Sequence, residues 1–177
     1  MNKIEKIQII FGFFCIGLII CAITIWGFVS VYLRSYYYWF NRNLTSSVEF
    51  NIVPMLFGIW MSYISVPFLV RNFNPLLSLG ICAAFKIIGY LGYLITDSTG
   101  GFLFSGFVIS YVEHMILGVS GFYIVTLFKE EKGKVISFMV SGVGFNVLVW
   151  SSIMTKIINP DNIPPNENQI FLKEISD

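Results

Sequence analysis

Three ionisable side chains lie well inside apolar stretches of this sequence: Lys86, Glu113 and its neighbour His114. A lone charge in the hydrocarbon core of a membrane costs about 2.5–3.5 kcal/mol on insertion scales, so such groups normally face a partner or a wet cavity. One hypothesis is a substrate or proton site, in which Lys86 holds an anion and Glu113 or His114 exchanges a proton. A second is a Lys86–Glu113 pair between adjacent helices that neutralises itself and serves packing. A third is that one of these residues meets a charge on another subunit.

Five long apolar stretches must position these residues, and each is long enough to cross the roughly 30 Å hydrocarbon core as a helix. They run over Ile9–Leu33, Ile52–Val70, Pro75–Ile95, Phe102–Phe128 and Val135–Ile158. The sequence is 56% hydrophobic and 12% charged, with a mean hydropathy of +0.76, whereas about one-quarter of a soluble domain is charged. We therefore expect an all-α integral membrane protein, with a bundle of five transmembrane helices over residues 1–158 and a polar tail over residues 159–177.

Several function classes have no support in the sequence. The net charge is +1 and the basic residues are scattered through the loops, so nucleic acid is not an expected partner. The three cysteines fall inside apolar stretches without CxxC spacing, and a lone histidine beside an acid lacks the spacing of metal ligands, so neither a disulfide framework nor a metal is expected. The chain has no HExxH motif, nucleophile elbow or facing carboxylates. We expect no enzymatic activity and no cofactor.

Basic residues near the ends of the apolar stretches predict their orientation. The amino-terminal side carries Lys3, Lys6, Arg71, Lys129, Lys132 and Lys134, and the opposite side carries Arg34, Arg42 and Lys156, with Lys173 farther out. The most charged connection is a loop motif formed by Lys129, Glu130, Glu131, Lys132, Gly133 and Lys134. This count favours an amino terminus on the inner side and a tail on the outer side.

Small residues recur along the third, fourth and fifth apolar stretches. They are Gly80, Ala83, Ala84, Gly89, Gly92, Gly118, Ser120, Gly121, Ser137, Ser141, Gly142 and Gly144. In lipid, helices associate by close backbone approach, which small residues allow. We expect these helices to pack tightly against other helices, in this chain or in another.

The block Phe122–Asn162 joins an aromatic-led charged loop to the glycine-rich segment Ser141–Phe145 and ends at Ile158-Asn-Pro-Asp-Asn162. Trp26-Gly27, Tyr32–Tyr36 and Val66-Pro67 add shorter matches. On these residues the chain, from Ala22 to Asn162, resembles the amino-terminal half of a major facilitator superfamily transporter, in particular the oxalate/formate antiporter and monocarboxylate-transporter-like group. The resemblance implies five helices of a truncated six-helix half.

The sequence departs from that family in ways that shape the expected function. The family's loop between helices two and three carries an acidic residue and paired basic ones, of which only Arg71 is present here. A sixth helix and a second half are also missing from the sequence, and transport in the family depends on two halves moving about a midplane site. The family's basic substrate-binding residues, as the resemblance implies, lie in the missing half.

We therefore expect a non-enzymatic accessory or scaffold subunit of a larger membrane assembly, with other integral membrane subunits and lipids as partners. The alternative is a half-transporter of small carboxylates that works only when paired with a second chain. The mitochondrial inner membrane is favoured over the plasma membrane, because large assemblies there collect additional membrane subunits.

Overall fold

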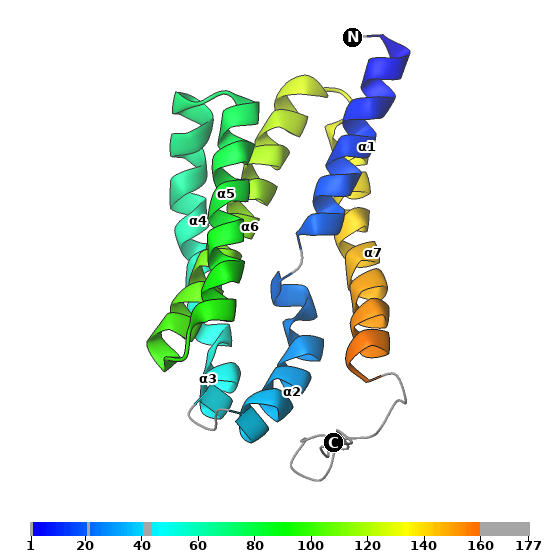
Figure 1. Ribbon diagram of the computed structural model, residues 1–177. Coiled ribbons are helices and arrows are strands. Elements are labelled where there is room, and N and C mark those ends of the chain that lie inside the picture. Colours follow the sequence, from blue (N-terminus) through cyan, green and yellow to red (C-terminus); the bar gives the residue numbers. More distant parts are fainter. Residues whose placement is uncertain (1, 21, 41–43, 160–177) are drawn as a thin grey trace.

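The structure is a computed structural model that describes residues 2–20, 22–40 and 44–159 (Figure 1). The expected polar tail, apart from Asn159, lies outside the described residues, as do Arg42 and Lys173 of the orientation count. The described residues form helices and their connections only. The helices are α1 (Lys3–Ile19), α2 (Ala22–Phe40), α3 (Thr45–Phe50), α4 (Ile52–Asn72), α5 (Pro75–Ile95), α6 (Thr99–Leu127) and α7 (Lys132–Ile158).

Four helical segments in the described residues are long and apolar enough to cross a membrane, as expected of an integral multi-pass membrane protein. They are Thr45–Asn72, which joins α3 to α4, and then α5, α6 and α7. Their starts follow local rules. Asn74 caps α5 by accepting a hydrogen bond from the Leu77 N–H, with Pro75 in the first turn, and Ser98 caps α6 through the Gly101 N–H. These segments agree closely with the last four predicted apolar stretches.

The first predicted stretch, Ile9–Leu33, is not one helix, and this corrects the sequence prediction. α1 ends at Ile19, Ile20 has extended backbone dihedrals (φ −90°, ψ 101°), and α2 begins at Ala22. Neither proline nor glycine stands at the break, but Ile19, Ile20 and Ile23 are β-branched and lower the local helix propensity. Ile20 is buried in a core cluster with Val112 and other α6 residues, so tertiary packing favours the interruption.

Helix α6 is the centre of the bundle (Figure 1). It packs extensively on α4 and α5 and also contacts α1, α2, α3 and α7. Accordingly 56% of its most apolar window is buried, against 17% in both α5 and α7. Two glycines allow the close approach of its neighbours: a Cβ at Gly58 of α4 would lie 2.7 Å from the Phe107 carbonyl oxygen, and one at Gly89 would lie 2.7 Å from the Ile109 side chain.

A second close crossing joins α1 to α7. A Cβ built on Gly17 would overlap the Met139 carbonyl oxygen, and one on Gly142 would lie 2.5 Å from the Phe14 carbonyl oxygen. The two helices therefore meet backbone to backbone immediately before the break in α1. This contact fixes the position of the carbonyl groups that α1 leaves unpaired at its end.

Candidate functional site at the interrupted helix

The break between α1 and α2 exposes carbonyl groups that a continuous helix would have paired. In hydrocarbon an unpaired backbone polar group costs several kcal/mol, so irregular backbone survives there only when protein groups or a wet cavity satisfy it. Side chains from two other helices do so. The Lys86 Nζ donates to the Ile19 carbonyl oxygen at 2.7 Å, and the Asn146 Nδ2 donates to the Leu18 carbonyl oxygen.

The same ammonium group forms a buried ion pair. The Lys86 Nζ lies 2.7 Å from Glu113 Oε1, with the Lys86 side chain 11% exposed and that of Glu113 1% exposed. The Tyr90 ring centroid lies 5.8 Å from the Nζ, which adds an attraction between cation and ring. The carboxyl end of α1 also carries partial negative charge, which favours a cation at this position. Lys86 therefore joins α1, α5 and α6 through one charged group.

The polar residues of this site share one depth in the bundle. Lys86 is the twelfth of the 21 residues of α5, Glu113 the fifteenth of 29 in α6, and Asn146 the fifteenth of 27 in α7. Each therefore lies close to the midpoint of its helix. A charged group, an amide and a broken helix meet far from both ends of the bundle, where water is scarce and polar groups are costly.

Asn146 is a site residue that the sequence analysis missed. It is fully buried, and in the described part of the chain its Oδ1 has no hydrogen-bond partner, while its Nδ2 holds the end of α1. An amide in the middle of the apolar stretch Val135–Ile158 was the signal that could have identified it, because such a side chain in lipid normally bonds to another helix.

His114 and the charged loop stand apart from this site. The His114 Nδ1 lies 3.0 Å from the Ser110 carbonyl oxygen, one turn earlier in α6, so the structure does not bring the imidazole to Lys86. Within the loop motif of residues 129–134, Glu131 forms an ion pair with Lys6 of α1 at one end of the bundle. The hydrogen bond from Lys6, followed by its positive charge, lowers the pKa of the Glu131 carboxyl from its ordinary value.

The polar groups at the break are suited to bind an anion or to take up a proton. In the described residues no group of three or more His, Cys, Asp or Glu side chains is gathered as a metal site. A carboxylate such as Glu113 can accept a proton, and an ammonium such as Lys86 can then pair with a different anion. The Asn146 Oδ1, on the side chain that binds the neighbouring Leu18 carbonyl oxygen, is a further acceptor at the break.

No protein-family model matches the chain, and neither a curated protein nor a solved structure does so.

Proposed function

We propose that the chain is a helical bundle of a membrane transporter for small carboxylates, acting together with a second helical bundle. The observation that carries the proposal is the interrupted α1–α2 helix, on whose break Lys86 and Asn146 converge at mid-bundle, with Glu113 paired to Lys86. Discontinuous helices in transporters surround sites near the bilayer midplane. The class of substrate rests on the resemblance to the oxalate/formate antiporter group.

The chemistry proposed at this site is an exchange of counter-ions on Lys86. When Glu113 is ionised it neutralises the ammonium, and the site is closed to anions. When Glu113 takes up a proton, Lys86 loses its buried counter-charge, and a substrate carboxylate replaces it. The substrate and the proton then cross together, and the ion pair re-forms after both leave.

Two outward-facing stripes of small residues support contact with a second bundle. Gly80, Ala83 and Ala84 lie exposed on α5, and Ser137, Ser141 and Gly144 lie exposed on α7. Their spacings of three and four residues keep each stripe on one helix face. Such faces allow the backbone of another helix to approach closely in lipid.

The transport proposal is tested by uptake of labelled formate and oxalate into liposomes that contain the purified chain, alone and with candidate partner bundles. We expect saturable uptake that increases when the outer solution is acidified. Lys86→Met should abolish it, and Glu113→Gln should retain exchange but lose the response to acid. Arg71→Met is the matched control, because Arg71 is exposed at the far end of α4. Unchanged uptake by Lys86→Met would refute the assignment.

A second candidate function is the accessory or scaffold role, and the self-contained chemistry of the site favours it. Lys86 binds the freed Ile19 carbonyl oxygen and neutralises Glu113, and Asn146 binds the freed Leu18 carbonyl oxygen. Because these partners all lie within the chain, the ion pair can serve packing alone. The outward small-residue faces then meet other integral membrane subunits or lipids, as in an assembly of the mitochondrial inner membrane.

Native purification separates the two candidates. The scaffold role predicts that other membrane proteins co-purify with the chain, and that Ala84→Leu or Ser141→Leu releases them while the helical content is retained. It also predicts no carboxylate uptake by any preparation. Uptake that depends on Lys86 would remove the scaffold role as the main function.

A further inference from the structure

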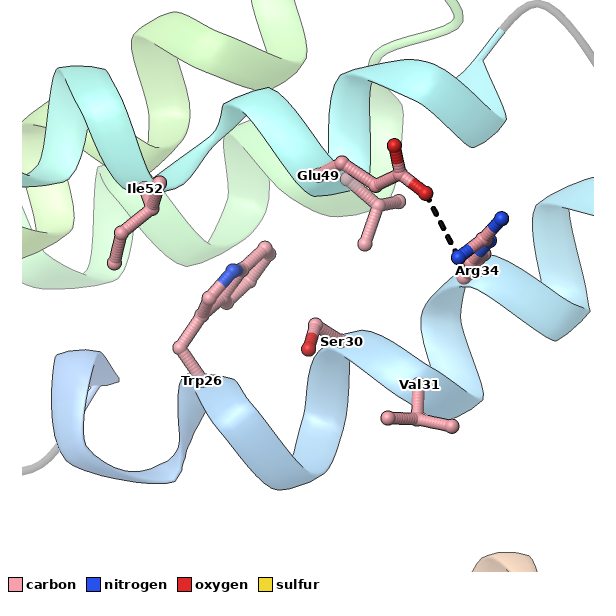
Figure 2. A pocket seen from close by; sticks show the side chains of 7 residues that line it. Trp26, Ser30, Val31, Arg34, Glu49 and Ile52 are labelled. Carbon is pink, nitrogen blue, oxygen red and sulfur yellow. Dashed lines mark ion pairs between the residues drawn. The ribbon is translucent and has the colours of Figure 1, made fainter. Parts of the chain in front are cut away.

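A pocket separate from the interrupted helix lies between α2 and the α3–α4 segment, with a volume of about 220 Å³, several times the roughly 30 Å³ share of one water molecule. Figure 2 shows Trp26 and Ser30 rising from α2 on one side, Ile52 and Glu49 on the other, and the Arg34–Glu49 ion pair at one end. Trp26, Val48 and Ile52 make much of the wall apolar. The pocket is therefore amphipathic, with both charges together.

The pocket lies where apolar sequence gives way to polar sequence. The first apolar stretch ends at Leu33, one residue before Arg34, and the stretch of α4 begins at Ile52, three residues after Glu49. Tyr36 and Tyr37 follow in α2, with ring centroids 5.3 Å apart. Tyrosine and tryptophan gather at the headgroup level of a bilayer, so this end of the bundle corresponds to a membrane–water boundary.

The two charges leave capacity for a ligand. The Arg34 Nη1 lies 2.8 Å from Glu49 Oε1, while the side chains are 31% and 51% exposed. Ion pairs this exposed are weak, so a ligand that satisfies both charges can separate them. The Arg34 Nε is buried and without a hydrogen-bond partner in the described part of the chain, so the ligand is met by the two Nη groups. Once separated from Glu49, these groups can present parallel N–H donors to a phosphate.

We propose that this pocket binds the headgroup of a zwitterionic phospholipid that carries a primary ammonium group, of the phosphatidylethanolamine type. Its phosphate lies on Arg34, its ammonium on Glu49, and the apolar part adjoining the headgroup lies against Trp26 and Ile52. Because the ligand brings one negative and one positive charge, it leaves neither residue unpaired. A purely anionic lipid would meet the Glu49 carboxylate, and a quaternary ammonium cannot donate a hydrogen bond to it.

The test is native mass spectrometry of the full chain released from nanodiscs that hold phosphatidylethanolamine, phosphatidylcholine and phosphatidylglycerol in equal amounts. We expect preferential retention of phosphatidylethanolamine, and about a tenfold loss of that retention in Arg34→Gln, as removal of one charge-assisted contact implies. Glu49→Gln should reverse the preference toward phosphatidylglycerol, because the repelling carboxylate is gone. Arg71→Gln and Glu130→Gln, both exposed and distant from the pocket, should change nothing.

Circular dichroism of each variant shows whether it is folded. If Arg34→Gln does not fold, Glu49→Gln still tests the proposal. Soluble glycerophosphoethanolamine separates the two sources of this headgroup chemistry. If the soluble headgroup cannot displace the retained lipid, the pocket is a site for the membrane lipid. Binding of the soluble headgroup without lipid retention would overturn the lipid assignment, as would equal retention of the three lipids by the unmodified chain.

Discussion

A single ammonium group carries much of the polar architecture at the residue scale. Lys86 neutralises Glu113 and also ends α1 by binding the Ile19 carbonyl oxygen. Removing either partner of a buried pair leaves an uncompensated charge, which costs far more than the pair itself contributes. The two roles of Lys86 therefore make the variants at positions 86 and 113 unequal, although both break the same ion pair.

Lys86→Met should lower the free energy of unfolding by about 3–5 kcal/mol, the range for breaking a buried pair. Glu113→Gln should cost less, because Lys86 keeps its hydrogen bond to the Ile19 carbonyl oxygen. The double variant Lys86→Met/Glu113→Leu should recover much of the loss, since no charge is left buried. Reversible unfolding in mixed micelles, followed by circular dichroism, measures all three. A double variant no more stable than Lys86→Met would contradict the pairing.

Asn146→Leu should cost about 1–3 kcal/mol of unfolding free energy, because the Leu18 carbonyl oxygen is left without its donor. Asn72→Leu is the matched control. Its Nδ2 also donates to a backbone carbonyl, that of Phe68, but Asn72 is exposed. The same unfolding assay should show a change within about 0.5 kcal/mol for this surface position. Equal losses in the two variants would argue against a role for Asn146 at the break.

At the scale of elements, the sequence predicts most helices but not the interruption. Each of the helices α4 to α7 carries a long run of apolar residues, which predicts a helix. Asn74-Pro75, residues 96–98 and the charged loop mark where these runs begin and end. The break at Ile20 depends on donors from α5 and α7, which lie 67 and 128 residues away from their acceptors. No local pattern contains that information. The Lys86–Glu113 contact joins residues of α5 and α6 and depends on the packing of those two helices.

Two glycines of the crossing helices α1 and α7 should respond to alanine with opposite changes in stability. Gly17→Ala should destabilise the protein by about 1–3 kcal/mol, because its Cβ would overlap the Met139 carbonyl oxygen and force the helices apart. Gly144→Ala has open space around it and should stabilise α7 by up to about 1 kcal/mol through helix propensity. Thermal unfolding of the two variants tests this, and stabilisation by Gly17→Ala would show that the close crossing is wrong.

The Lys6–Glu131 ion pair should make the attachment of α1 to the charged loop depend on pH. The pKa of Glu131 is lowered in the folded protein, so its contribution is present above the ordinary value of 4.5 and is lost as the pH falls through the folded value. The protection of amide hydrogens in the first turns of α1, relative to their intrinsic exchange rate at each pH, should therefore fall below that range. The variant Glu131→Gln should show the lower protection at every pH, whereas Glu130→Gln should behave as the unmodified chain.

At the scale of the whole molecule, the connections other than the mid-bundle break between α1 and α2 gather at two opposite ends. The start of α1, the α4–α5 connection and the α6–α7 loop lie at one end, and the end of α2, helix α3, the α5–α6 connection and the end of α7 lie at the other (Figure 1). The Lys6–Glu131 ion pair is a direct contact between the start of α1 and the α6–α7 loop, and it agrees with this placement. This arrangement matches an alternation of the chain across a bilayer in which α1 and α2 together act as one interrupted span, as we propose.

Labelling with a membrane-impermeant maleimide tests this topology in sealed vesicles. Single cysteines replace Asn2, Tyr36, Ser98 or Glu130, each exposed, in a chain whose three native cysteines are changed to alanine. We expect Asn2 and Glu130 to react from one side, and Tyr36 and Ser98 from the other, with all four reacting after permeabilisation. The Asn2 and Tyr36 pair is decisive, because α1 with 17 residues and α2 with 19 are each near the lower limit for a span. If Asn2 and Tyr36 react from the same side, α1 and α2 do not form a single crossing, and the break at Ile20 cannot lie at the membrane midplane.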